Sequence, residues 1–197
     1  MSVSQTIFDA VGGEEAFLRL AHAWHTRCLA DPVVSHAFSH GYHPQHSERL
    51  AAYWAESLGG PPAHSASMGD ETMVTKMHSG NGEHVEMDER AQVCFAQAID
   101  DARLPDDQRL RSMLEAYFRW ATRRMAGYPD SPDDVPMGLP LARWSWDGPQ
   151  EHRDTDSPTA TTDQQVWACS SSGRNSLHLR SRSSRRVPID RSVPSRS

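Results

Sequence analysis

Apolar side chains recur at every third or fourth position through most of the first 128 residues, which is the spacing of one buried helical face. No segment alternates convincingly between apolar and polar side chains, so we predict an all-α fold. The pattern predicts helices over residues 4–11, 14–30, about 44–58, 86–103 and about 107–126, with a further short helix ending at His78.

The predicted helix over residues 14–30 shows the pattern most clearly. Its Phe17, Leu20, Trp24 and Cys28 form one apolar stripe, and the helix ends before Pro32. Double glycines at 12–13 and 59–60 end two other helices. The last predicted helix repeats the same spacing with Leu110, Met113, Leu114, Tyr117, Phe118, Ala121 and Met125.

The pattern changes twice along the chain. Residues 1–128 form the helical domain, and residues 129–147 are rich in proline but retain Trp144 and Trp146. We expect this extension to dock on the helices, with a loose linker as the alternative. Residues 148–197 are mostly serine, threonine, aspartate and arginine, so their composition predicts disorder.

Composition narrows the functional classes. A formal net charge of -6 does not favour nucleic-acid binding, and no apolar run approaches the roughly 18 residues of a membrane helix. Three scattered cysteines and a first segment without a signal-peptide pattern favour a reduced, cytoplasmic protein. We expect a monomer or a small homo-oligomer. Histidine is the compositional outlier, with 11 residues, most of them before residue 85.

The stretch from Phe38 to His78 is the most informative part of the chain. It contains an aromatic residue, a helix with His46 near its start, a double-glycine stop and a short helix that ends in His78. Two histidines on separate helices, with apolar faces between them, can bind the two sides of a flat iron cofactor. This arrangement makes a haem pocket the leading hypothesis.

Several of these segments resemble the group II truncated haemoglobins. The resemblance rests on Ile7-Phe-Asp-Ala-Val-Gly-Gly, Leu29-Ala-Asp-Pro-Val-Val, Ser47-Glu-Arg-Leu and Gly59-Gly-Pro, at the spacing of that family. It covers about residues 5–126 and does not extend to the tail. The resemblance implies a two-over-two helical sandwich around haem b that reversibly binds dioxygen or another diatomic ligand.

The resemblance also implies roles for particular residues. His78 takes the place of the proximal iron ligand, with His84 as its competitor. Phe38 corresponds to the aromatic residue on the porphyrin face, and His46 to the distal position facing the iron. The remaining predicted haem contacts are Leu50 in the distal wall, Arg49 near a propionate, and Met77.

Two positions depart from the family pattern. His25 stands where the family usually has a tyrosine, and Val93 aligns with its usual tryptophan. The usual distal hydrogen-bonding cage is therefore missing. A pair formed by His25 and His46 would be a different distal site, more polar and titratable near neutral pH.

Three alternatives stay open at this stage. The protein could be a carrier, store or sensor of a diatomic ligand, or a haem redox enzyme such as a nitric oxide dioxygenase or a peroxidase. An enzyme would need electrons from an external reductase. The third alternative is a zinc-binding helical module that uses His36, His40, His43 and His46, although Gly41 and Pro44 interrupt a continuous helix there.

Overall fold

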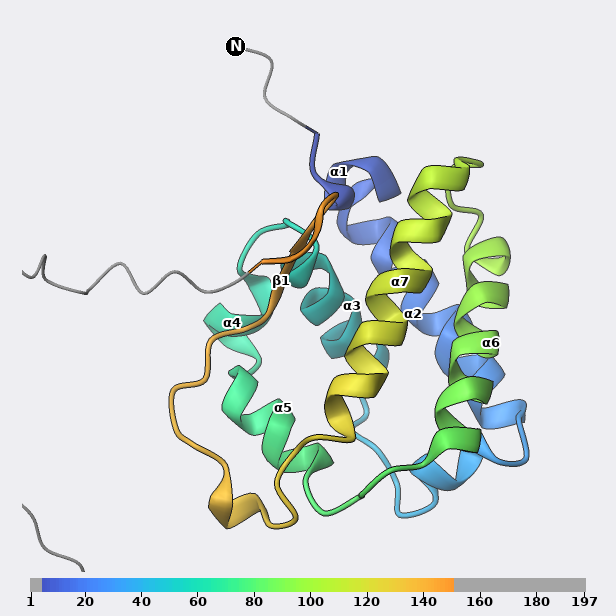
Figure 1. Cartoon of the computed structure of the whole chain (residues 1–197). Helices are drawn as coiled ribbons and strands as arrows, with labels where there is room; N and C mark the ends of the chain where they lie inside the picture. The colour runs from blue at the N-terminus through green and yellow to red at the C-terminus, as the bar shows by residue number, and fades with distance from the viewer. Residues whose placement is uncertain (1–4, 151–197) are drawn as a thin grey trace, which may run out of the picture. The chain divides into compact units, whose positions relative to one another are not determined.

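The computed structural model describes residues 5–150 and confirms the predicted all-α fold (Figure 1). None of the helices in this range is both long and apolar enough to cross a membrane. The helices are α1 (Ile7–Val11), α2 (Gly13–Ala30), α3 (His46–Ser57), α4 (Ala63–Ser67), α5 (Glu71–His78), α6 (Val85–Asp101) and α7 (Gln108–Met125), with 3-10 turns η1 (Val34–Phe38) and η2 (Pro132–Asp134).

Two pairs of helices form the body of the molecule. The α2 helix packs against α3 on one side and α6 on the other, and α6 packs against α7 (Figure 1). Aromatic rings join these helices. Phe95 of α6 stacks on Phe118 of α7 with ring centroids 4.2 Å apart, and Trp54 of α3 meets both rings edge-on. Trp24 of α2 in turn meets Trp54 and Phe118 edge-on. Such pairs add to the large apolar area that each ring buries, so this cluster fixes the relative positions of the four helices.

Glycine is required where α3 ends. A Cβ atom added at Gly60 would lie 2.6 Å from the Phe8 ring and 2.7 Å from the Ala55 carbonyl oxygen. The backbone of the double glycine can therefore lie directly against α1, where the Phe8 amide donates to the Leu58 carbonyl at 3.0 Å. This close approach explains the double-glycine stop of the sequence.

The structure differs from the predicted elements in three places. The α3 helix begins at His46 because Pro44 and Gln45 form a turn, and the short α4 helix was not predicted. A two-stranded antiparallel hairpin is formed by β1 (Arg143–Ser145) in the proline-rich segment and β2 (Gly148–Gln150), whose three residues begin the segment that was expected to be disordered. Strands of three residues are too short to show an alternating pattern, so the sequence gives no sign of them.

The proline-rich segment makes specific contacts with the helices. Arg143 donates to the Glu56 carbonyl oxygen at 3.0 Å, and the Trp146 indole donates to the Gln5 carbonyl oxygen at 2.8 Å. Trp144 is 7% exposed and packs edge-on against Tyr117 of α7. Trp144 is therefore part of the hydrophobic core, and Trp146 packs against it.

We expect Trp144→Ala to lower the free energy of unfolding by about 3–5 kcal/mol, because truncating a buried aromatic leaves a cavity. Denaturant unfolding of the full chain measures this loss. Met137→Ala is the control, since Met137 is 76% exposed and its truncation should change stability by no more than about 0.5 kcal/mol. Equal stability of the two variants would show that the segment does not contribute to the core.

Candidate functional site

Two helices present polar side chains to each other. On α3, His46, Leu50 and Tyr53 share one face, because residues separated by three or four positions stack along a helix. On α5, a matching face carries Glu71, Thr75 and His78. The Tyr53 hydroxyl on α3 donates to the Glu71 carboxylate on α5 at 2.8 Å, so the two faces are in direct contact there. Figure 1 shows α5 beside α3 and α7.

The backbone holds the ring of His78 in one orientation. Its Nδ1 lies 2.8 Å from the Val74 carbonyl oxygen, one turn earlier on α5. A carbonyl oxygen can only accept a hydrogen bond, so Nδ1 carries the proton. The neutral ring then has its lone pair on Nε2. This arrangement, with one ring nitrogen bonded to a backbone carbonyl and the other free, is the one that metal-binding histidines adopt.

The local sequence explains where α5 begins and ends. The Asp70 carboxylate caps the helix by accepting a hydrogen bond from the Met73 amide at 2.9 Å. The helix ends at His78, and a glycine-rich loop follows. His78 therefore lies on the last turn of a short helix whose first turn is fixed by a cap.

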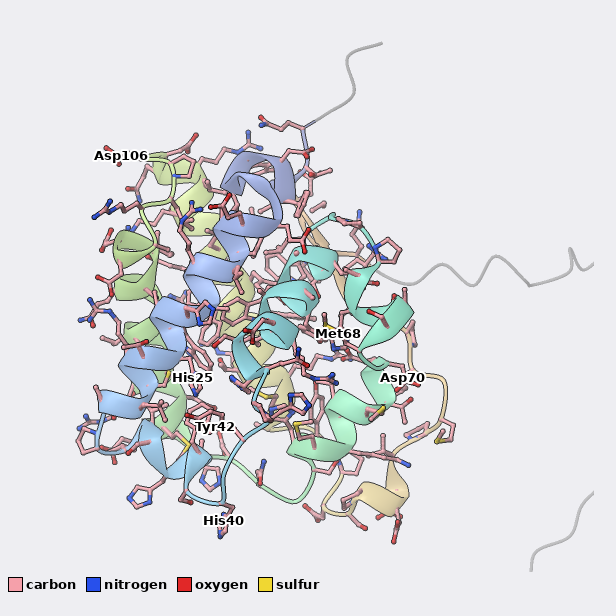
Figure 2. All side chains as sticks on the ribbon, turned by 180° about the vertical axis from the view of Figure 1, so that it is seen from behind. His25, His40, Tyr42, Met68, Asp70 and Asp106 are labelled. Carbon is pink, nitrogen blue, oxygen red and sulfur yellow. The ribbon has the colours of Figure 1, made fainter. Side chains whose placement is uncertain are left out.

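A cluster of four aromatic rings lies at the start of α3. His25 of α2 has its ring centroid 4.9 Å from Phe38, 4.6 Å from Tyr42 and 4.6 Å from His46. We call these four residues the distal cluster. Figure 2 shows His25 and Tyr42 on the same side of the molecule, near the loop that carries His40. The sequence candidates Phe38, His25 and His46 thus come together although three different segments carry them.

The two histidines of the distal cluster are held in their neutral form. Burial, reinforced by His25 and His78, lowers the pKa of His46 to about 4. Burial also lowers the pKa of His25, with a smaller contribution from His22. Within the described residues, Nε2 of His25 and Nδ1 of His46 are buried without a hydrogen-bond partner. Buried polar atoms without a partner are rare in folded proteins, and a bound ligand or water can account for them.

Ser47 supports the ring of His25. Its hydroxyl oxygen lies 3.3 Å from His25 Nδ1, and both residues are buried. If the hydroxyl donates this bond, the proton of the neutral ring stays on Nε2, the nitrogen without a partner. Ser47 can therefore determine which nitrogen of His25 acts as a donor.

Two other predicted haem contacts, Arg49 and Met77, lie away from the facing sides of α3 and α5. The Arg49 guanidinium donates to the Met68 carbonyl oxygen, so it joins α3 to the residue after α4. Met77 is 70% exposed. Leu50 is half-buried and packs on the hydrophobic core, which agrees with its predicted place on the inner face of α3. The structure thus brings Leu50 to the site but leaves Arg49 and Met77 outside the facing surfaces.

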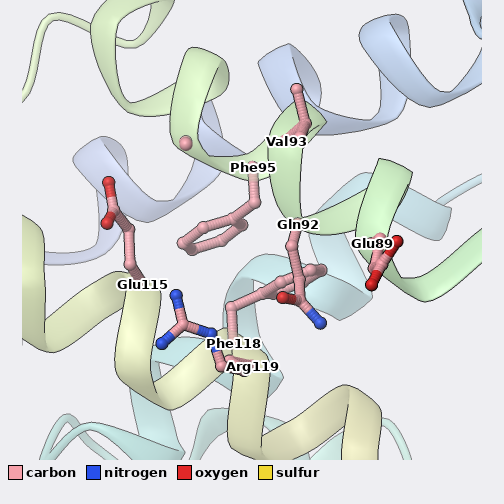
Figure 3. Close-up of a pocket in the computed structure, with 8 residues that line it drawn as sticks. Glu89, Gln92, Val93, Phe95, Glu115, Phe118 and Arg119 are labelled. Carbon is pink, nitrogen blue, oxygen red and sulfur yellow. The ribbon is translucent and has the colours of Figure 1, made fainter. Parts of the chain in front are cut away.

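Val93 is also outside the distal cluster. It is 56% exposed and lines a groove of about 270 Å³ between α6 and α7, together with Phe118 and Arg119 (Figure 3). Ala91, two residues earlier, faces α2 instead, and its carbonyl oxygen accepts a hydrogen bond from the Trp24 indole at 3.2 Å. The resemblance placed Val93 at the position of the family's usual tryptophan, but its side chain lies on the exposed face of α6.

The competing metal assignments find no geometric support in the described part of the chain. His84 is exposed at the start of α6, and His36, His40 and His43 are also exposed. Between residues 5 and 150, no group of three or more histidine, cysteine, aspartate or glutamate side chains is arranged to hold a metal ion. The histidine-bound zinc alternative therefore has no site here.

The sequence did not single out four residues that belong to this region. Tyr42 completes the distal cluster, Ser47 contacts His25, and Tyr53 donates a hydrogen bond to Glu71 at 2.8 Å. Tyr42 could have been noticed as an aromatic residue between histidines in a loop. Glu71 follows a helix cap, where a carboxylate ordinarily interacts with the helix dipole, so its burial leaves no signal in the sequence.

This helical arrangement, with α2 and α3 against α6 and α7, defines a globin of the truncated type. Residues 6–122 match the family model of the bacterial-like globins, and the chain belongs to this family. None of the curated proteins matches the chain.

Solved structures give the same result. The chain is 30% identical to a thermostable haemoglobin from Thermobifida fusca, covering 64% of this chain and 99% of that one, with a TM-score of 0.53. It is 26% identical to the haemoglobin of Chloroflexus aurantiacus, covering 62% and 98%, with a TM-score of 0.53. The fold also matches the group II truncated haemoglobin from Bacillus anthracis at 20% identity, 65% and 95% coverage and a TM-score of 0.56. The resemblance to group II truncated haemoglobins is confirmed.

Membership of this family implies a haem cofactor, and the residues present fit one. His78 offers an oriented ring with a free nitrogen. On the facing side, the distal cluster offers two ring nitrogens that are buried without partners in the described residues. A haem between α3 and α5 would thus meet a ligand on one side and neutral imidazoles on the other.

The lowered pKa of His46 makes the stability of the haem-free protein depend on pH. The folded state favours the neutral imidazole of His46. The contribution of this neutral ring to the free energy of unfolding is therefore complete above pH 6.5 and is lost as the pH falls toward 4. As the pH falls over this range, preferential protonation of His46 in the unfolded state should lower the free energy of unfolding by roughly 2–3 kcal/mol. Denaturant unfolding at a series of pH values should show a shallower slope for His46→Gln than for the unsubstituted chain.

His40→Gln is the matched control, because His40 is exposed on the adjoining loop. Its slope should equal that of the unsubstituted chain. If His46→Gln also left the slope unchanged, burial of a neutral His46 would be contradicted.

Proposed function

We propose that this globin binds haem b between α3 and α5, with His78 as the axial ligand, and reversibly binds dioxygen or another diatomic ligand beside the distal cluster. The observation that carries the proposal is the hydrogen bond from His78 Nδ1 to the Val74 carbonyl, which leaves Nε2 free for a metal. When bound, the haem supplies an iron centre with one position for a diatomic ligand. Cytoplasmic location and a monomeric or small homo-oligomeric state belong to the same proposal.

The distal residues would control the bound ligand through hydrogen bonding. With Ser47 donating to Nδ1, His25 holds a proton on Nε2 and can donate it to a polar ligand such as dioxygen. His46 stays neutral at physiological pH, so it adds a donor without adding a charge. Phe38 excludes water from the space between them by packing against both rings.

A redox enzyme is the second candidate. The observation that favours it is the polar character of the site, which extends beyond the distal cluster to the hydrogen-bonded Tyr53 and Glu71. Hydrogen-bond donors around a bound ligand also polarise it toward reaction, as a nitric oxide dioxygenase or a peroxidase requires. Such an enzyme would receive electrons from an external reductase.

Replacing His78 by glycine should abolish stoichiometric haem binding, because α5 then no longer supplies an axial nitrogen. Absorption spectroscopy during haem titration measures the loss, and added imidazole should restore binding by filling the space of the missing ring. His84→Ala is the control and should bind haem normally. An unchanged five-coordinate haem spectrum in the His78 variant would exclude His78 as the ligand.

Replacing His25 by leucine should raise the dioxygen dissociation rate about tenfold, since one hydrogen bond contributes about 1.4 kcal/mol. Stopped-flow displacement of dioxygen by carbon monoxide measures this rate. His43→Leu, in the exposed loop nearby, should leave the rate unchanged. A rate in the His25 variant equal to that of the unsubstituted protein would mean that His25 makes no bond to the ligand.

A further inference from the structure

A partly buried hydrogen bond joins α3 to α5 beyond the distal cluster. The Tyr53 hydroxyl donates to Oε2 of Glu71 at 2.8 Å. Glu71 has no exposed surface, and its Oε1 lies 2.8 Å from Nη1 of Arg124 on α7. Three helices therefore meet at a tyrosine, a carboxylate and a guanidinium, which we call the Tyr53 triad.

Helical spacing places this triad beside the proposed haem site. On α3, Tyr53 follows His46 by seven residues on the same face, and on α5, Glu71 precedes His78 by seven residues. His46 and His78 thus lie at one end of the two facing helices, and the Tyr53–Glu71 hydrogen bond joins the two helices at the other end. A flat group between the histidines would have one edge toward this bond.

Packing alone does not account for the triad. Replacing a buried ion pair by apolar residues is often neutral or stabilising, so its presence is weak evidence for a structural role. Burial raises the pKa of Glu71, although Tyr53 and Arg124 both favour its charged form. Glu71 therefore has more affinity for a proton than an ordinary glutamate, and the nearest proton donor is the Tyr53 phenol.

This geometry suits one-electron oxidation of the tyrosine. A phenol that loses an electron becomes a strong acid, so its proton must pass at once to a nearby base. Glu71 Oε2 accepts the hydrogen bond along which that proton would move, and Arg124 keeps the carboxylate in position.

We infer that Tyr53 is a redox-active tyrosine. After a hydroperoxide has oxidised the haem, Tyr53 would supply one electron to the haem, while the phenolic proton of Tyr53 passes to Glu71. The Tyr53 O–H bond breaks, the Glu71 O–H bond forms, and a neutral tyrosyl radical remains. This inference rests on the proposed haem binding and gives the site a peroxidase-type activity.

An external phenol completes the cycle as the electron donor. Over one turn, hydrogen peroxide and two phenols give two waters and two phenoxyl radicals. One of the two electrons passes through Tyr53, which regains its proton from Glu71 when the donor reduces it. The other electron returns the haem to its starting state.

Electron paramagnetic resonance of the haem-loaded full chain tests the inference. The ferric protein is mixed with hydrogen peroxide, frozen within seconds, and examined for a tyrosyl signal near g = 2. We expect Tyr53→Phe to lose most of the signal. Tyr117→Phe is the matched control and should retain it, because Tyr117 is also buried but makes no hydrogen bond to a carboxylate among the described residues.

Glu71→Gln separates proton transfer from packing. Its amide oxygen can still accept the Tyr53 hydrogen bond, but the side chain has no affinity for the proton. We expect a radical yield several-fold below that of the unsubstituted protein at equal haem content.

The outcomes distinguish the two proposals. A Soret band that shows no stoichiometric haem uptake would overturn both of them. Full haem uptake together with equal radical signals in Tyr53→Phe and the unsubstituted protein would overturn only the role of Tyr53. A signal lost in Tyr53→Phe but unchanged in Glu71→Gln would overturn the proton transfer to Glu71.

Discussion

The candidate site depends on one constraint, which is that α3 and α5 present polar faces to each other across a short distance. The hydrogen bond from His78 to the Val74 carbonyl gives α5 an oriented imidazole, and the Tyr53–Glu71 bond connects the two helices directly. The aromatic core of α2, α3, α6 and α7 holds α3 firmly, and Arg124 connects α5 to α7. The aromatic core and the Arg124–Glu71 ion pair therefore hold the facing sides of α3 and α5 in a fixed orientation.

Burial gives these faces their chemistry. Burial lowers the pKa of both His25 and His46 below that of free histidine and so favours their neutral rings. The same cause raises the pKa of Glu71 and makes it a better proton acceptor. One physical effect thus prepares hydrogen-bond donors at one end of the site and a base at the other.

The sequence was sufficient for the long helices α2, α6 and α7 and for the family. The apolar stripes of α2 and α7 have the helical period, and the double glycine before Pro61 fits a close approach of α1 and α3 that only glycine allows. It also identified Phe38, His25 and His46, which the structure brings together from three segments. These positions could be predicted because the resemblance to the group II truncated haemoglobins assigns them.

The rest required tertiary structure. The irregular loop between α5 and α6 has no periodic pattern that fixes the register of α6, and Val93, which was expected in the distal site, lies on the exposed face of that helix. The partner of Arg49 is a carbonyl at the end of α4, a helix without a clear sequence signal. Glu71 was missed because a carboxylate in the first turn of a helix is ordinarily exposed, whereas here Tyr53 and Arg124 compensate for its burial.

The most direct test of a haem site between α3 and α5 is a titration of the haem-free full chain with haem, followed by the Soret absorption. The account predicts saturation at one haem per chain and a shift of the ferrous Soret band when carbon monoxide is added. A titration that never saturates, with a spectrum equal to that of free haem, would contradict it.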